Sequence, residues 1–200
     1  MEGALVERFL RRVAALAREG DPAAVLDAGC GEGVVAERLR AALPGAELTG
    51  IDLRAEAIAA ARGRVPDARF AVGDACAPAF GDGAFDLVVC TEVLEHLDDP
   101  RRALRELLRV SRGRVLVTVP HEPLFRLGNL ARGRHARRLG STPGHRWAWS
   151  RAGFLALVRR EAPGARWLSL LPWQGALIYT WSSSTTSKAS RAGSALASPV

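Results

Sequence analysis

A chain of 200 residues with 48% hydrophobic content can fill the core of one α/β domain, but not of two. Its formal net charge of +7 is compatible with a nucleic-acid partner, yet Lys188 is the only lysine, and a GC-rich genome produces that arginine bias without any function. Cys30, Cys76 and Cys90 show neither CxxC nor Cys/His spacing, which argues against a disulfide framework and a zinc site and favours a reducing cytoplasm.

The chain is expected to form a single folded domain over residues 1–181. Residues 1–20 mix glutamates with arginines and lack an apolar segment, so they are not expected to be a signal peptide. The longest uncharged stretch starts at Trp167, but its apolar part ends at Trp181, which is shorter than the ~20 residues that a membrane span needs. Residues 182–200 are rich in Ser, Thr, Ala and Gly and are expected to be a disordered tail.

Apolar residues recur at helical spacing in several segments and form short β-like runs in others. Helices are expected at about residues 3–19, 32–43, 54–62, 100–110 and 151–160. Strands are expected at about residues 23–28, 47–51, 68–72, 85–90, 114–119, 165–171 and 176–181. The run 85–90 is almost wholly apolar, which is typical of a strand buried on both faces of a parallel sheet. Asp99 and Pro100 supply a capping residue and a first-turn proline for the helix that follows.

This order of elements predicts an α/β fold. Helical segments separate all but the third and fourth of the first five strands, which indicates a parallel sheet with helices on both faces. Residues 172–175 read as a hairpin-like turn between the last two runs. The expected architecture is therefore a doubly wound, mostly parallel sheet of seven strands.

Acidic or small residues follow the expected strands, whose bodies are apolar. They are Asp27 and the glycine loop, Asp52, Asp74-Ala75, Thr91-Glu92 and Pro120-His121-Glu122. In an open doubly wound sheet, ligands bind outside the carboxyl ends of the strands, where the strand order reverses. These residues are therefore the candidates for a binding site.

The glycine loop after the first strand favours one class of ligand. A nicotinamide-dinucleotide fingerprint needs glycine at position 34, where this chain has Val34, because its third glycine is Gly33. Asp27 would also place a negative charge near a pyrophosphate. The same charge suits a ligand that carries an ammonium and a sulfonium group, whose single carboxylate can lie at the helix N-terminus.

Residues 23–120 resemble the class I S-adenosylmethionine (SAM)-dependent methyltransferases. The resemblance rests on the combination of VLDAGCGEG, Asp52 nineteen residues after Gly33, VGDA and FDLVVCTEVLEHLDDP. The LEHLDDP portion is most similar to the small-molecule, type 11-like branch of the family. The resemblance implies a Rossmann-like methyltransferase fold, SAM as the cofactor and methyl transfer as the reaction.

By the same resemblance, four strand ends carry the cofactor site. The methionine end of SAM is expected on the first strand and its loop, at Asp27, Gly29, Cys30, Gly31 and Gly33. Asp52 is expected to accept hydrogen bonds from the ribose hydroxyls, with Leu53 packing on the adenine. Asp74 and the backbone of Ala75 are expected to read the adenine edge, and Cys90-Thr91 to lie beneath the sulfonium.

Ordinary structural roles stay open for several of these residues. Asp52 and Asp74 could be strand-end turn residues or helix caps. Cys30 and Cys90 fit small buried hydrophobes better than nucleophiles. His96 fits a structural role as well as a functional one.

Residues 120–150 extend beyond the common core and carry a net charge of +5. Their arginines are Arg126, Arg132, Arg134, Arg137, Arg138 and Arg146. By the resemblance, the segment is expected to form a lid above the methyl-transfer site. It could bind an anionic acceptor through guanidinium forks, reach a lipid-linked acceptor at a membrane surface, or form a solvated cover. Trp147 and Trp149 could line an acceptor pocket, although packing against the sheet is expected for at least one.

The sequence thus predicts a SAM-dependent methyltransferase that modifies an O, N or C atom of a small-molecule or metabolite-derived acceptor. His121 is the first candidate for a base because it follows the fifth strand and histidine titrates near neutral pH, with His145 and Glu92 in reserve. An RNA methyltransferase is one alternative, although residues 90–93 lack the (N/D)PPY or Pro-Cys signature of many such enzymes. A non-catalytic SAM-binding protein is another. No metal site is expected, and the sequence leaves the oligomeric state open.

Overall fold

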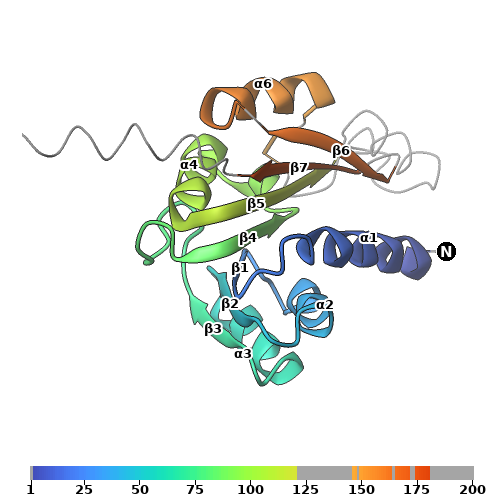
Figure 1. Ribbon diagram of the computed structural model, residues 1–200, viewed down its shortest axis with the longest axis vertical. Helices are drawn as coiled ribbons and strands as arrows, with labels where there is room; N and C mark the ends of the chain where they lie inside the picture. Colours follow the sequence, from blue (N-terminus) through green and yellow to red (C-terminus); the bar gives the residue numbers. More distant parts are fainter. Residues whose placement is uncertain (1, 121–145, 148, 164, 172–173, 181–200) are drawn as a thin grey trace, which may run out of the picture.

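Seven strands form one sheet in the order β3-β2-β1-β4-β5-β7-β6 in the computed structural model (Figure 1). The structure describes residues 2–120, 146–147, 149–163, 165–171 and 174–180. The strands are β1 (Ala24–Ala28), β2 (Glu47–Asp52), β3 (Arg69–Val72), β4 (Phe85–Thr91), β5 (Ser111–Pro120), β6 (Arg166–Leu171) and β7 (Gln174–Thr180). The helices are α1 (Glu2–Ala17), α2 (Val34–Ala42), α3 (Ala55–Arg64), the 3-10 turn η1 (Leu94–His96), α4 (Pro100–Val110) and α6 (Arg151–Glu161).

The strand order reverses between β1 and β4. From β1 the chain moves outward through β2 to β3, then returns to the far side of β1 and continues through β4 to β5, with every pairing among these strands parallel. β7 runs antiparallel to both β5 and β6. The doubly wound, mostly parallel architecture that the sequence predicts is confirmed, and β6 and β7 pair antiparallel. Of the turn expected at 172–175, Gln174 and Gly175 belong instead to β7, and 172–173 lie outside the described residues.

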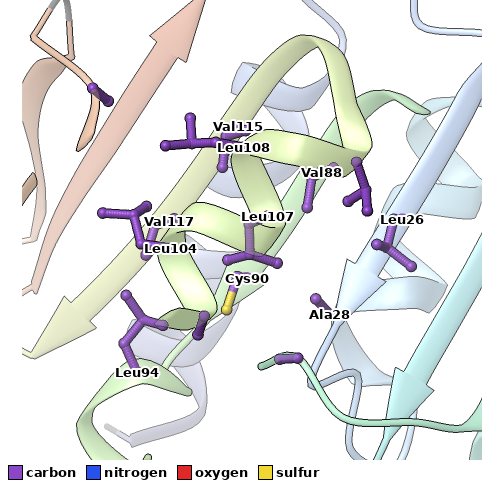
Figure 2. Close-up of a cluster of buried hydrophobic side chains, with 14 of the residues drawn as sticks. Leu26, Ala28, Val88, Cys90, Leu94, Leu104, Leu107, Leu108, Val115 and Val117 are labelled. Atoms are coloured by element: carbon purple, nitrogen blue, oxygen red, sulfur yellow. The ribbon is translucent and has the colours of Figure 1, made fainter. Parts of the chain in front are cut away.

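Successive side chains of the central strands point to opposite faces of the sheet, and each face carries a hydrophobic layer. Val25 of β1 and Val89 of β4 lie in the layer that contains α1, α2 and α3. Their neighbours Leu26 and Val88 lie in the opposite layer, which contains α4 and α6. Figure 2 shows this second layer between α4 and the strands beneath it. A strand buried on both faces has no solvent side, which explains its continuous apolar sequence.

Helix α4 begins and packs as its sequence indicates. The Asp99 side chain accepts a hydrogen bond from Arg102 N, 2.9 Å away, and Pro100 occupies the first turn. Leu104 and Leu107 are 2% and 0% exposed and face the sheet. This packing places α4 on the face of the sheet opposite α1, α2 and α3.

The main local differences from expectation lie between elements. β5 begins directly at Ser111, although its first residues were expected to form only a helix stop. Gly113 explains the early start, because a Cβ there would be 2.2 Å from the carbonyl oxygen of Asp86 on the adjacent strand. The turn η1 was not expected at all. The expected tail at 182–200 lies outside the described residues.

Candidate functional site

A cavity of about 510 Å³ opens at the carboxyl ends of the central strands, where the strand order reverses. Its volume lies within the usual range for small-molecule sites. Seven residues expected at the site line it: Gly29, Gly31, Asp52, Leu53, Asp74, Ala75 and Glu92. The sheet therefore brings together side chains from four different strand ends.

The glycine loop between β1 and α2 forms one wall of this cavity. Gly29 has φ +78°, and a Cβ there would be 2.4 Å from Cγ2 of Val93. Gly29 therefore needs to be glycine for both its backbone conformation and its packing. At Gly31, the nearest atom to a Cβ would be Nη2 of Arg54, 3.9 Å away, so this part of the loop faces open space.

Asp27 lies at the end of β1, directly before the loop. Its side chain is 0% exposed, and neither carboxylate oxygen has a hydrogen-bond partner among the described residues. Burial, with a further contribution from the negative charge of Asp52, raises the pKa of Asp27 to about 7. A buried carboxylate without a partner is costly, and a cationic ligand would supply the missing interaction.

Asp52 joins the end of β2 to the glycine loop. Its Oδ2 accepts a hydrogen bond from Gly31 N at 3.0 Å, and its Oδ1 accepts one from Arg54 N at 2.9 Å. Leu53, which follows it, is 61% exposed beside the cavity. The exposed Leu53 side chain could pack against a ring of a ligand, and the neighbouring Asp52 carboxylate could accept hydrogen bonds from hydroxyl groups.

Asp74 and Ala75 contribute the wall beyond β3. Oδ1 of Asp74 accepts a hydrogen bond from Cys76 N at 2.7 Å, the geometry of an Asx turn. Ala75 is buried. The turn role that the sequence allowed for Asp74 is therefore present, and the residue also lines the cavity.

Glu92 has a backbone conformation that is unusual for its residue type. It follows β4 with φ +55°, in the left-handed region, which costs about 1–2 kcal/mol for a residue with a side chain. Glu92 N donates to the backbone oxygen of Thr118 at 3.1 Å, and the Thr118 hydroxyl donates to Glu92 Oε1 at 2.8 Å. Thr118 is 0% exposed near the C-terminal end of β5. Contacts with β5 thus offset the cost of the turn.

Five described residues that were expected at the site do not line the cavity: Asp27, Cys30, Gly33, Cys90 and Thr91. Burial, followed by the charges of Asp27 and Asp52, raises the pKa of the Cys30 thiol to about 12. Burial also raises the pKa of Cys90 well above its usual value. Both thiols stay protonated and lie in the hydrophobic layers, which supports their interpretation as small buried hydrophobes.

Five lining residues were not in the expected set: Arg54, Gly73, Val93, His96 and Leu97. Three of them belong to the turn around η1, which bends the chain back over the end of β4. A three-residue turn has no periodicity that a sequence reveals. The motif LEH indicated that His96 could be functional, but it did not predict that His96 lines the cavity.

Of the expected lid at 120–150, the structure describes Pro120 and, at the C-terminal end, residues 146–147 and 149–150. Arg146 N and Trp147 N both donate to the backbone oxygen of Glu95, at 2.8 and 3.2 Å. Trp147 Nε1 donates to the backbone oxygen of Leu97 at 2.8 Å. This end of the segment is therefore attached to η1, next to the cavity. His121 and His145 lie outside the described residues.

The two tryptophans at this end have different surroundings. Their rings stack with centroids 6.0 Å apart, and Trp147 is 42% exposed. Trp149 packs on Phe154 of α6, whose ring centroid is 5.1 Å away, and joins the layer beside the sheet. The expectation that at least one tryptophan packs against the sheet is confirmed for Trp149.

No group of three or more His, Cys, Asp and Glu side chains within the described ranges has a geometry that could hold a metal ion. None of the helices in that part of the chain is long and apolar enough to cross a membrane.

Comparisons with known proteins agree with this geometry. Residues 26–117 match the model of a family described as a methyltransferase domain. A demethylmenaquinone methyltransferase from Thermotoga maritima is 36% identical over 112 residues, 55% of this chain and 49% of that protein. A ubiquinone biosynthesis O-methyltransferase from Pseudomonas paraeruginosa is 36% identical over 146 residues, 64% of this chain and 62% of that protein. The chain spans about half the length of the first of these relatives.

Solved structures share the fold at lower identity. The plantazolicin methyltransferase BpumL, solved in complex with S-adenosylhomocysteine (SAH), superposes with a TM-score of 0.71 at 18% identity, over 88% of this chain and 82% of that one. The YcgJ protein from Bacillus subtilis superposes with a TM-score of 0.65 at 23% identity, over 84% of this chain and 72% of that one. These likenesses bear on the architecture alone.

Proposed function

We propose that this chain, whose residues 26–117 match a methyltransferase-domain model, is a class I SAM-dependent methyltransferase that transfers a methyl group to an O, N or C atom of a small-molecule acceptor. Its cofactor is SAM. The observation that carries the proposal is Asp27, a fully buried carboxylate without a described partner, directly behind a glycine loop that opens on the cavity. A ligand with an ammonium group fits that position, whereas a pyrophosphate does not.

We propose that the cavity and the residues directly behind it hold SAM from one end to the other. Asp27 and the loop Gly29–Gly33 would hold its methionine end. Asp52, fixed by two backbone N–H groups, would accept hydrogen bonds from the ribose hydroxyls, with exposed Leu53 against the adenine. Asp74 and the backbone of Ala75 would contact the adenine edge. Cys90-Thr91, at the end of β4, would lie beneath the sulfonium.

When bound, SAM supplies a methyl group on a positively charged sulfur, from which it can be displaced in line. The protein contributes mainly the alignment of the two reactants and a site shielded from water. The cavity walls orient the two reactants and exclude water, and such alignment supplies much of the acceleration in a reaction between two bound partners. A base must then lie within hydrogen-bond distance of any proton that the acceptor loses. His121, His145 and Glu92 are the proposed candidates.

The proposed acceptor is anionic or attached to a lipid, which would account for the arginine-rich sequence of 120–150, the segment proposed as a lid. The relatives named for demethylmenaquinone and for ubiquinone biosynthesis support an acceptor from metabolism over a nucleic acid. We place the protein in the cytoplasm with at most peripheral membrane contact. The free cysteines Cys30, Cys76 and Cys90 support a reducing compartment.

Calorimetric titration with SAH tests the cofactor site. Wild-type protein should bind SAH, and Asp52→Asn should weaken binding about tenfold because the ribose hydroxyls lose a charged acceptor. Asp67→Asn is the matched control, since Asp67 is exposed and pairs with Arg40 away from the cavity. Absence of SAH binding by the wild type would contradict the proposal.

Methyl transfer is tested separately with labelled SAM and fractionated cell extract. Label should appear in a small-molecule or lipid fraction. Label in RNA would instead favour a nucleic-acid methyltransferase. SAH binding without transfer to any fraction would favour a non-catalytic SAM-binding protein.

A further inference from the structure

The contact between Glu92 and Thr118 joins two residues that lie 26 positions apart in sequence. Thr91 and Thr118 are partners in the parallel pairing of β4 and β5, so Glu92 is the first residue beyond that pair. The buried Thr118 hydroxyl donates to Glu92 Oε1 at 2.8 Å and accepts from Glu92 N at 3.2 Å. One hydroxyl therefore binds both the backbone and the carboxylate of the same residue.

This hydroxyl holds Glu92 in a conformation that a non-glycine residue rarely adopts. With φ +55°, Glu92 is one of two non-glycine residues with positive φ among the described residues, and the other, Asp21, lies in a turn at the opposite end of β1. Strain of this kind persists where surrounding contacts enforce it, and it clusters at functional sites. The chain could make the same turn at lower cost with glycine, but it would then lose the carboxylate.

The position of Glu92 gives that carboxylate a role. Glu92 lines the cavity, and its neighbour Val93 packs directly on Gly29 of the glycine loop. Asp52 and Asp74, the proposed nucleoside contacts, lie beyond β2 and β3. The β4 end of the cavity is therefore the end left for the sulfonium and the acceptor.

Resting on the proposed function, we propose that Thr118 is a positioning residue that holds the Glu92 carboxylate toward the methyl-transfer end of the cavity, where it binds a cationic or N–H or O–H group. A carboxylate is an acceptor only, so the group that it binds in the cavity must be a cation or a hydrogen-bond donor. Such a group selects acceptors that bring a hydroxyl or an amine to the transferred methyl group.

The test compares two ligands that differ at the transfer point. Sinefungin carries a protonated amine on carbon where SAM carries its methylated sulfur, whereas SAH has neither the charge nor the methyl group. Calorimetry gives the ratio of their dissociation constants for each variant. The wild type should prefer sinefungin, and Glu92→Gln should reduce that preference about tenfold, because the amine loses a charged acceptor.

Variants of Thr118 separate positioning from a structural role. Thr118→Val keeps the shape but removes the hydroxyl, and it should reduce the sinefungin preference about threefold to fivefold while SAH affinity stays near the wild-type value. Thr118→Ser keeps the hydroxyl and should retain the preference. Glu47→Gln is the matched control, since Glu47 lies on the opposite end of β2, exposed and paired with Arg69.

Several outcomes would contradict the proposed role of Thr118 and Glu92. An unchanged ratio in Glu92→Gln, equal effects of the valine and serine variants, or loss of SAH binding by Thr118→Val would each overturn the inference. A wild type that binds SAH without preferring sinefungin overturns the inference and leaves the proposed function intact. A wild type that binds neither ligand overturns both.

Discussion

Replacing Asp27 with asparagine should change how the stability of the ligand-free protein depends on pH. The carboxylate is fully buried without a hydrogen-bond partner among the described residues. Burial, and then the charge of Asp52, raises its pKa from 3.8 to about 7. Cys30 and Cys90, the thiols whose own pKa values Asp27 helps to raise, stay neutral in this range and add no competing titration.

The sign of the effect follows from the direction of the shift. A folded state that binds the proton more tightly than the unfolded chain is stabilised below pH 3.8, and it loses that stabilisation as the pH rises through about 7. A shift of roughly 3 pH units corresponds to about 4 kcal/mol, or about 1.4 kcal/mol per pH unit across the window. Asp27→Asn has no charge to acquire and should lack this loss.

The assay is urea unfolding of both proteins at intervals between pH 4 and pH 8, without ligand. The free energy of unfolding of Asp27→Asn minus that of the wild type should rise by up to about 4 kcal/mol across this range. Asp86→Asn is a control whose difference from the wild type in free energy of unfolding should stay nearly constant from pH 4 to pH 8, because a pKa lowered from 3.8 places the titration of Asp86 below this range. Although burial raises the pKa of Asp86, hydrogen bonds from Ala24 N and Arg112 lower it overall. Wild-type and Asp27→Asn curves that run parallel from pH 4 to pH 8 would refute the reasoning.

Two glycine substitutions test the packing around the site. Gly29→Ala should cost about 2–4 kcal/mol of unfolding free energy and abolish SAH binding, because the methyl group meets Val93 and φ is +78°. Gly45→Ala, with nothing within 4 Å, is the control, and equal effects of the two would contradict the geometry. Gly113→Ala should cost about 3 kcal/mol in urea unfolding, since backbone of Asp86 blocks the methyl group; wild-type stability would rule out this close approach.

The sheet could be predicted from the sequence because its strands are buried on both faces. Residues 85–90 have no polar alternation, and that absence indicates a central parallel strand without any knowledge of its neighbours. The helix cap at Asp99 could also be predicted, because its hydrogen-bond partner Arg102 lies only three residues away in the sequence. The expected strand-end residues Asp52, Asp74 and Glu92 then reach one cavity because parallel strands end at the same edge.

The contacts that hold the site were beyond sequence reasoning because they depend on register. Thr118 lies in an apolar strand, and its neighbours in the sequence do not distinguish it from an ordinary core residue. Its pairing with Glu92 follows only from the alignment of β4 with β5. The hydrogen bond from Gly31 N to Asp52 likewise needs the geometry of two strand ends. Sequence spacing can predict which residues reach the site. It cannot predict the residues that hold them in place by hydrogen bonds.

The charge of the cavity is opposite to the charge of the chain, and this contrast favours a cationic ligand. The protein carries +7 overall, yet the cavity lining includes Asp52, Asp74 and Glu92, with Asp27 buried behind it. Arg54 lies among them, but its Nε is 3.4 Å from Asp52 Oδ1, so its charge is partly used within the wall. Burial and the charge of Asp52 raise the cost of ionising Asp27, and a bound cation would lower that cost. A pyrophosphate would add to that cost, whereas the ammonium and sulfonium of SAM reduce it.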